Sequence, residues 1–430
     1  MRTVLVTGPG GSGRTTVAAA TAHAAARRGK RTLLLSGEAD ALVGASAGTV
    51  PTQVGDGLWL ARTDSGTHFR TEVLALQERC SAALDLLGAH RFEEAELTEL
   101  PGSEEFALLH ALRGLRGADW DVVVVDMPPV RDAIGLLALP EQLRRYLRRM
   151  LPPERQAARA LRPVLAQLAG VPMPAQWLYE TAARWEKELA AVQDLVTDRN
   201  TTVRLVAEPG PAAEDAVRTA RLGLALYGRD VETLVANRIL PAESPDPWLA
   251  ALRVQQEKVL HGWYTDRPAQ SAVCEVRHLG RDPRGADDLA ALEASSFGGV
   301  FGTDGIPGGC AADTGLAAGL APLEPGRDDP WVIQQQDEDR GAEAPGDAAA
   351  LSPGAERGEL HWVLPLPGAV KEELQLLRRG DELFLGVGPF RRILPLPSAL
   401  RRCTVSGAGL RDGLLRVRFT PDPALWPRGR

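Results

Sequence analysis

The stretch "TGPGGSGRTT", residues 7–16, decides the fold, because it lies between a short apolar run and a long alanine-rich segment. The run "RTVLVT" at 2–7 is typical of a strand that is buried on both faces of a parallel sheet. The segment 14–30 predicts a helix that ends at Gly29, since helices often end at glycine. Strand, glycine-rich loop and helix form the context of the phosphate-binding motif G-x-x-x-x-G-K-[ST]. The stretch fits this motif except at Arg14, which replaces the lysine.

Glycines in such a loop let backbone N–H groups converge on phosphate oxygens, and the following helix presents its positive end to the same anion. Thr15 is the predicted Mg²⁺ ligand of the loop, through its hydroxyl. The guanidinium of Arg14 is larger than an ammonium and planar, so we expect the exchange to impair hydrolysis more than binding. The predicted nucleotide-binding residues here are Gly8, Gly10, Gly11, Ser12, Gly13, Arg14, Thr15 and Thr16. The alternative is a glycine-rich turn that binds no ligand.

A second ligand position follows the apolar run in "ADWDVVVVDMPP", residues 118–129, which ends in Asp126. The prolines after Asp126 prevent the strand from continuing, so its carboxylate is expected at the carboxyl edge of the sheet, near Mg²⁺. The alternative for Asp126 is a residue that only forms a turn. Further strands are predicted within 31–36, 201–210, 230–240 and 271–280, and further helices within 212–228 and 247–264. This alternation predicts a doubly wound parallel α/β domain of the P-loop NTPase class.

Composition divides the chain into four parts. Residues 1–297 are predicted to form the nucleotide-binding domain. Residues 139–198 are predicted to form a helical subdomain within it, because apolar residues recur there at helical spacing: Leu143, Leu147 and Met150, then Leu161, Leu165 and Leu168. That apolar stripe fits core packing or, alternatively, a groove for an apolar client. Residues 298–358 are poor in large apolar side chains and are expected to form a flexible acidic linker. Short strands within 359–420 predict an antiparallel β-sandwich.

Charge and cysteine usage exclude several classes of function. The formal net charge of the 430 residues is -7, which argues against a nucleic-acid partner. The four cysteines lie far apart without a C-x-x-C pair, so they predict neither a disulfide framework nor a zinc site. No apolar run is long enough for a membrane span and no signal-peptide pattern precedes the first strand, so a cytoplasmic protein without an integral membrane segment is expected.

Four segments taken together resemble the ArsA-type anion-transporting ATPases and the related ATPases that target tail-anchored proteins. These segments are "GPGGSGRTT" at 8–16, "LLLSGEADAL" at 33–42, "DMPPVRDAIGLLALP" at 126–140 and "VETLVANRILP" at 231–241. Their order and spacing extend the resemblance over about 1–297, and the β-rich segment 359–420 resembles the α-crystallin-type, small-heat-shock-like domain of some bacterial members.

The resemblance implies roles for individual residues. Glu38 stands where the family carries the aspartate that orients the attacking water, so Glu38 and Arg14 are the catalytic candidates; a solvated loop carboxylate is the alternative for Glu38. Asp126 stands at the magnesium-linked aspartate of the second switch. Asn237 matches the residue that recognises adenine, with a turn former as the alternative, and Pro283 and Arg284 belong to a second adenine-side loop, "DPRG".

Pro9 occupies the position of the family's first lysine, which reaches across a homodimer to the partner's nucleotide. The resemblance therefore implies an ArsA-like homodimer that binds ATP and Mg²⁺ and hydrolyses ATP slowly or not at all, with nucleotide-dependent conformation used to handle a protein client or partner. One alternative is a non-enzymatic chaperone or assembly scaffold that no longer binds nucleotide. Another is one subunit of a heterodimer with an intact paralogue. The cysteines match neither the metalloid-binding nor the zinc-binding cysteines of the family.

Overall fold

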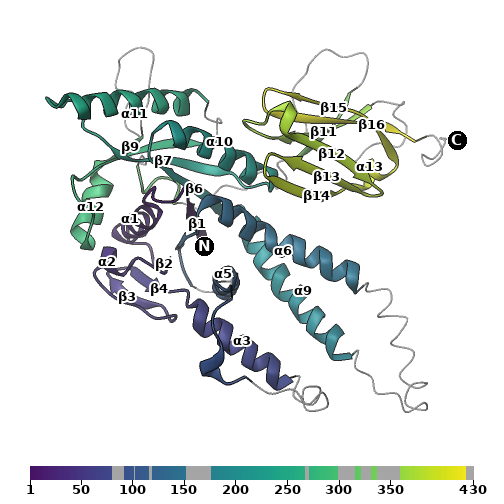
Figure 1. Cartoon of the computed structure of the whole chain (residues 1–430), viewed down its shortest axis with the longest axis horizontal. Coiled ribbons are helices and arrows are strands. Elements are labelled where there is room, and N and C mark those ends of the chain that lie inside the picture. The colour runs from purple at the N-terminus through teal and green to yellow at the C-terminus, as the bar shows by residue number, and fades with distance from the viewer. Residues whose placement is uncertain are drawn as a thin grey trace. The chain divides into compact units, whose positions relative to one another are not determined.

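The computed structural model describes residues 1–79, 92–100, 102–115, 119–151, 176–266, 271–298, 315–320, 331–336 and 359–422 (Figure 1). The chain forms two compact units. The first contains Met1–Ala213 and Glu232–Leu323, and the second contains Glu214–Val231 and Glu324–Arg430.

A nine-stranded sheet organises the first unit, in the order β3-β4-β2-β5-β1-β6-β7-β8-β9. Its strands are β1 (Arg2–Thr7), β2 (Thr32–Leu35), β3 (Thr52–Gly55), β4 (Leu58–Ala61), β5 (Val122–Asp126), β6 (Thr201–Ala207), β7 (Val231–Ile239), β8 (Ala272–Arg277) and β9 (Ser296–Gly298). β1 lies between β5 and β6 and pairs in parallel with both, while β3 and β9 pair antiparallel at the two edges. The predicted doubly wound parallel α/β fold is confirmed.

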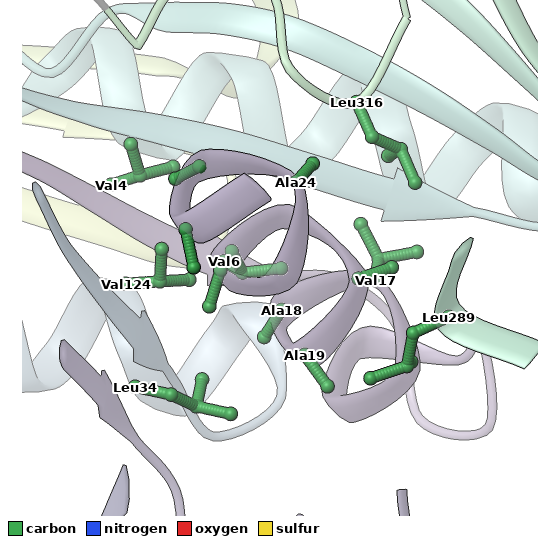
Figure 2. Packing of buried hydrophobic residues seen from close by; sticks show 14 of the residues in the cluster. Val4, Val6, Val17, Ala18, Ala19, Ala24, Leu34, Val124, Leu289 and Leu316 are labelled. Carbon is green, nitrogen blue, oxygen red and sulfur yellow. The ribbon is translucent and has the colours of Figure 1, made fainter. Parts of the chain in front are cut away.

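Helix α1 packs its small side chains against the middle of this sheet (Figure 2). Its alanines, among them Ala18 and Ala19, let the helix approach closely, and Val4 and Val124 supply branched side chains from β1 and β5. The helices of this unit are α1 (Arg14–Arg27), α2 (Asp40–Val43), α3 (Ser65–Arg79), α5 (Ser103–Gly114), α6 (Val130–Met150), α9 (Gln176–Thr197), α11 (Pro247–Thr265) and α12 (Gly285–Ser295), with the short η1 (Glu94–Glu96). This packing fixes where α1 begins, and therefore where its positive end lies.

Helices α6 and α9 run side by side away from the sheet (Figure 1). Glu186 of α9 accepts hydrogen bonds from Arg144, over 3.0 Å, and from Arg148, over 2.6 Å, both of α6. These helices occupy the two ends of the range predicted for the helical subdomain, although α6 starts earlier, at Val130. Of the predicted apolar stripe, Leu143 and Leu147 of α6 are half-buried and Met150 is exposed, whereas Leu161, Leu165 and Leu168 lie outside the described residues.

In the range predicted to be a flexible linker, 298–358, Gly298 ends β9, and two further stretches are described and structured. In 315–320, Leu316 and Leu320 are buried in the core of the first unit. Arg204 of β6 donates to the Leu316 carbonyl over 2.6 Å. Backbone carbonyls of this stretch thus satisfy a buried guanidinium group. The second stretch forms strand β10; the rest of the range lies outside the described residues.

The second unit contains two antiparallel sheets, β10-β11-β16-β15 and β12-β13-β14. Their strands are β10 (Val332–Gln336), β11 (Glu359–Pro365), β12 (Leu374–Arg379), β13 (Glu382–Val387), β14 (Phe390–Pro395), β15 (Cys403–Arg411) and β16 (Leu414–Pro421), with η2 (Lys371–Glu373) and α13 (Ser398–Arg401) between them. Alternate residues such as Leu383, Leu385, Val417 and Phe419 are buried, as in a sandwich. The predicted antiparallel β-sandwich is confirmed.

Most of helix α10 (Pro211–Leu226) also belongs to the second unit. The Tyr227 hydroxyl, just after this helix, donates to the Arg391 carbonyl over 2.7 Å, and Arg392 donates to the Leu226 carbonyl over 2.9 Å.

Of the four cysteines, Cys274 and Cys403 are free and buried, whereas Cys80 and Cys310 lie outside the described residues. Within the described ranges no helix is both long and apolar enough to cross a membrane.

Candidate nucleotide site

The loop between β1 and α1 is a tight turn followed directly by the helix. The Ser12 N–H donates to the Pro9 carbonyl over 3.3 Å, and Gly11 inside this turn has φ 78°. Gly13, with φ 85°, is the N-cap residue of α1, and glycine adopts both conformations without strain. No side chain caps the helix, and its first turn contains no acidic residue. Neither a cap side chain nor an acidic residue of its own first turn therefore offsets the positive end of α1.

Two of the glycines are required by close contacts. A Cβ atom at Gly8 would lie 1.9 Å from the Val206 carbonyl oxygen of β6, and one at Gly13 would lie 2.3 Å from Nδ2 of Asn237. By contrast, a Cβ atom at Gly10 would have no neighbour within 4 Å. The loop is thus packed against β6 and β7 on one side and open at its tip. The Ser12 hydroxyl is buried in this loop, with no hydrogen-bond partner among the described residues.

Asp126 ends β5 beside the start of α1. Its Oδ2 accepts a hydrogen bond from the Ser36 hydroxyl over 2.8 Å, whereas its buried Oδ1 has no partner in the described part of the chain. Burial raises the pKa of Asp126, while the hydroxyls of Ser36 and Thr15 and the charge of Arg14 act in the opposite direction. A carboxylate and a hydroxyl are hard oxygen ligands of the kind that Mg²⁺ prefers. The orphaned Oδ1 and the Thr15 hydroxyl therefore fit a magnesium ion.

The two catalytic candidates lie near this carboxylate in different environments. The Arg14 guanidinium donates a hydrogen bond to the Met127 carbonyl, so the structure places it against the backbone that follows Asp126. Glu38 is exposed, and its N–H donates to the Ser36 hydroxyl over 3.2 Å. Ser36 in turn donates to Asp126, so the Glu38 backbone is joined to this carboxylate through Ser36, and the Glu38 charge acts to raise the pKa of Asp126. The structure thus brings both candidates together around Asp126.

The residues predicted to contact adenine lie in two different places. Asn237, at the end of β7, is buried and donates from Nδ2 to the Ser12 carbonyl over 2.9 Å, so it is part of the phosphate loop's support. Pro283 and Arg284 lie after β8 at the start of α12, where the Arg284 N–H donates to Asp288 over 2.8 Å. Among the described residues, no hydrogen bond joins Pro283 or Arg284 to the loop.

Three residues of the site were not identified from the sequence: Ser36, Arg238 and Gln256. Ser36 follows β2 at the same sheet edge as Asp126, so the position of polar residues after strands could have indicated it. Arg238 donates to the Gly11 carbonyl over 3.1 Å, and its place beside Asn237 was the available signal. Gln256 lies in the middle of α11, where the sequence offers no signal of a role.

Together these features define the class: a P-loop α/β protein with a glycine loop after its first strand and a carboxylate at the end of the adjacent strand. The chain belongs to the anion-transporting ATPase family, whose model matches residues 1–295. A second model, the HSP20-like domain found in ArsA, matches residues 357–419. The resemblance inferred from the four sequence segments and the β-rich segment is confirmed.

Relatives match along nearly the whole chain. An uncharacterized protein of Streptomyces coelicolor, SCO2128, is 54% identical over 436 residues, covering 100% of each chain. Protein Rv2184c of Mycobacterium tuberculosis is 31% identical, covering 99% of this chain and 97% of its own. The putative arsenical pump-driving ATPase 1 of Aquifex aeolicus is 23% identical, covering 93% and 95%.

Proposed function

We propose that this protein binds ATP with Mg²⁺ as a homodimer, and that it uses the nucleotide mainly as a conformational ligand for handling a protein client or partner. The observation that carries the proposal is the pair of buried oxygens without hydrogen-bond partners among the described residues, Ser12 Oγ and Asp126 Oδ1. Such atoms are costly unless a ligand satisfies them. Both belong to the segments that flank the uncapped start of α1, where an anion is favoured.

In this proposal each part of the nucleotide has its own residues. The N–H groups of the loop and the first turn of α1 bind phosphate oxygens, and Thr15 and Asp126 hold Mg²⁺. Asn237, Pro283 and Arg284 form the adenine side. Bound Mg²⁺ supplies positive charge that offsets the phosphate charge.

Hydrolysis is proposed to be slow or absent because two cationic groups of the family's site are altered. Pro9 has no cation to reach a partner's nucleotide, and the Arg14 guanidinium is engaged with the Met127 carbonyl. Cations that stabilise the transferring phosphoryl group are worth roughly 10³–10⁵ in rate in related reactions. Glu38 remains the candidate base, and its exposure leaves it free to reorient.

Three measurements test the proposal. Steady-state phosphate release by the purified full chain is expected to be far below that of an intact P-loop ATPase; comparable turnover would contradict slow hydrolysis. Thermal unfolding is expected to shift upward with Mg-ATP, because a ligand at a hundredfold excess over its Kd stabilises by about 2.7 kcal/mol. A stoichiometry of one polypeptide per particle by light scattering would contradict the homodimer.

The HSP20-like match favours a second candidate, a chaperone or assembly scaffold that no longer binds nucleotide. It predicts no thermal shift with Mg-ATP and suppression of client aggregation that is independent of nucleotide. A heterodimer with an intact paralogue accounts equally for Pro9, and co-purification of that paralogue with the tagged chain would support it.

A further inference from the structure

The end of β7 is irregular where it meets the phosphate loop. The pairing of β7 with β8 shifts register between Ala236 and Ile239, and Arg238 within this shift has φ 57°. In a regular strand, consecutive side chains point to opposite faces of the sheet. Here the irregularity lets two consecutive side chains reach one loop: Asn237 donates to the Ser12 carbonyl over 2.9 Å, and Arg238 donates to the Gly11 carbonyl over 3.1 Å. Bulges next to functional sites re-aim side chains in this way.

These two hydrogen bonds fix the orientation of loop peptides. In a trans peptide the carbonyl and the following N–H point in opposite directions. Because Asn237 holds the Ser12 carbonyl, the Gly13 N–H is directed away from β7. Arg238 fixes the preceding peptide, whose Ser12 N–H closes the turn on Pro9. The residues of the bulge therefore determine which loop N–H groups remain free for a ligand.

Gln256 joins this bulge to helix α11. It is buried, its Nε2 donates to the Arg238 carbonyl over 3.1 Å, and its Oε1 accepts from the Leu240 N–H over 3.0 Å. The side chain thus bridges Arg238, inside the register shift, and Leu240, the residue that follows β7. Glu208 forms an ion pair with Arg238 over 3.1 Å and holds the guanidinium beside the loop. Asn237, Arg238 and Gln256 each have a specific hydrogen-bond partner. A displacement of the phosphate loop therefore changes the hydrogen bonds that Gln256 makes from α11, and the reverse also holds.

We propose that Asn237, Arg238 and Gln256 form a positioning relay that couples the phosphate loop to α11. Through it, occupancy of the loop changes the local stability of α11, and the contacts of α11 set the affinity of the loop for nucleotide. The coupling is reciprocal, as any linkage between two sites must be. The nucleotide side of the relay rests on the proposed function, whereas the structural link between Gln256 and the loop does not.

Hydrogen exchange of the full chain tests the link without nucleotide. The variant Gln256→Leu removes the hydrogen bonds to Arg238 and Leu240, and we expect the Ser12 amide, which donates to the Pro9 carbonyl, to exchange about tenfold faster, the change for one lost net hydrogen bond. Glu257→Gln is the control on the same helix, because it alters only the exposed pair with Arg253. Unchanged loop exchange in a folded Gln256→Leu protein would overturn the relay.

A second variant separates positioning from folding. Arg238→Gly suits the left-handed backbone, so it preserves the bulge while removing the contacts with Gly11 and Glu208. We expect an unchanged melting temperature, faster loop exchange and an ATP affinity about tenfold weaker, with partial rescue by Arg238→Lys. If the loop amides of both Arg238→Gly and Gln256→Leu exchange at the wild-type rate, the relay is contradicted.

Addition of Mg-ATP tests the reciprocal arm. It is expected to slow exchange in α11 of the wild type and of Glu257→Gln, but not of Gln256→Leu. Slowing of equal size in all three proteins would contradict the coupling. Failure of the wild type to bind Mg-ATP in calorimetry would overturn the proposed function instead, and the exchange of the nucleotide-free proteins would still decide whether Gln256 supports the loop.

Discussion

The Ser36 hydroxyl donates a hydrogen bond to Oδ2 of Asp126 over 2.8 Å and leaves Oδ1 of the same buried carboxylate without a described partner. Burial raises the pKa of Asp126, so the site destabilises the charged form that the proposed metal binding requires. A carboxylate whose charged form lowers the stability of the ligand-free protein, and whose oxygen can bind a cation, is typical of a functional site.

Substitution of this carboxylate is expected to separate stability from binding. Asp126→Asn keeps an acceptor for Ser36 and removes the buried charge, so the nucleotide-free protein should gain about 1 kcal/mol of unfolding free energy. The same variant should lose the Mg²⁺ dependence of ATP binding, weakening it about tenfold or more. Thermal unfolding with and without Mg-ATP measures both effects. Asp119→Asn, whose side chain is 98% exposed, is the control, and equal behaviour of the two variants would contradict the assignment.

The raised pKa of Asp126 also fixes a pH dependence. The folded protein holds this proton at pH values where the unfolded chain has released it, so the contribution of Asp126 to stability is present at low pH and falls as pH rises through the raised pKa. Mg²⁺ requires the ionised carboxylate, so affinity for Mg-ATP should rise over that same interval. Titrations between about pH 4 and about pH 8 on the wild type and Asp126→Asn measure this. An identical pH profile for both proteins would refute the prediction.

Two glycines of the loop provide a matched pair of variants. Gly13→Ala places a Cβ atom 2.3 Å from Asn237 Nδ2 at a residue with φ 85°, so it should destabilise the protein by about 1–3 kcal/mol and abolish ATP binding. Gly10→Ala meets no atom within 4 Å, and its stability should change by less than about 1 kcal/mol. Calorimetry and chemical denaturation of both variants give the comparison. The account of the loop fails if Gly13→Ala binds ATP as the wild type does.

Local sequence patterns predicted the parts of the site that are adjacent in the chain. The loop from Gly8 to Thr16 and the aspartate at the end of β5 follow from strand, loop and helix signals within short windows. The contact between Asn237 and Ser12 could not be derived in this way, because it depends on a register shift between two strands. Gln256 likewise acquires its role only when α11 packs beside β7.

The same limit applies to the rest of the fold. Buried arginines contradict the general expectation that charged residues are exposed, and nothing near Arg2 or Arg204 signals their shared partner Glu232. Strands β12 and β15 have weak signals of their own, since Leu377 of β12 is 63% exposed and β15 has Gly407 at its register shift. Both strands are defined by their neighbours in the sheet rather than by their own composition.

The cluster of Arg2, Arg204 and Glu232 is expected to be essential for stability. Arg204 is fully buried, binds Glu232 over 2.8 Å and donates to carbonyl groups of 315–320, including that of Ala318 over 2.9 Å. Arg204→Met would leave the carbonyls of Leu316 and Ala318 without this donor and Glu232 with only part of its partners, and it should cost about 3–5 kcal/mol in chemical denaturation. Arg28→Met, which removes a partly exposed pair with Glu293, should cost about 0–1 kcal/mol. Similar costs for both variants would show that the stretch 315–320 is not held by Arg204.

Calorimetric titration of the full chain with Mg-ATP tests the central claim most directly. The account predicts saturable binding of one nucleotide per chain in the wild type, and loss of that binding in Gly13→Ala but not in Gly10→Ala. Absence of any binding heat in the wild type up to about millimolar ATP, where cellular ligands of typical enzymes bind, would contradict it.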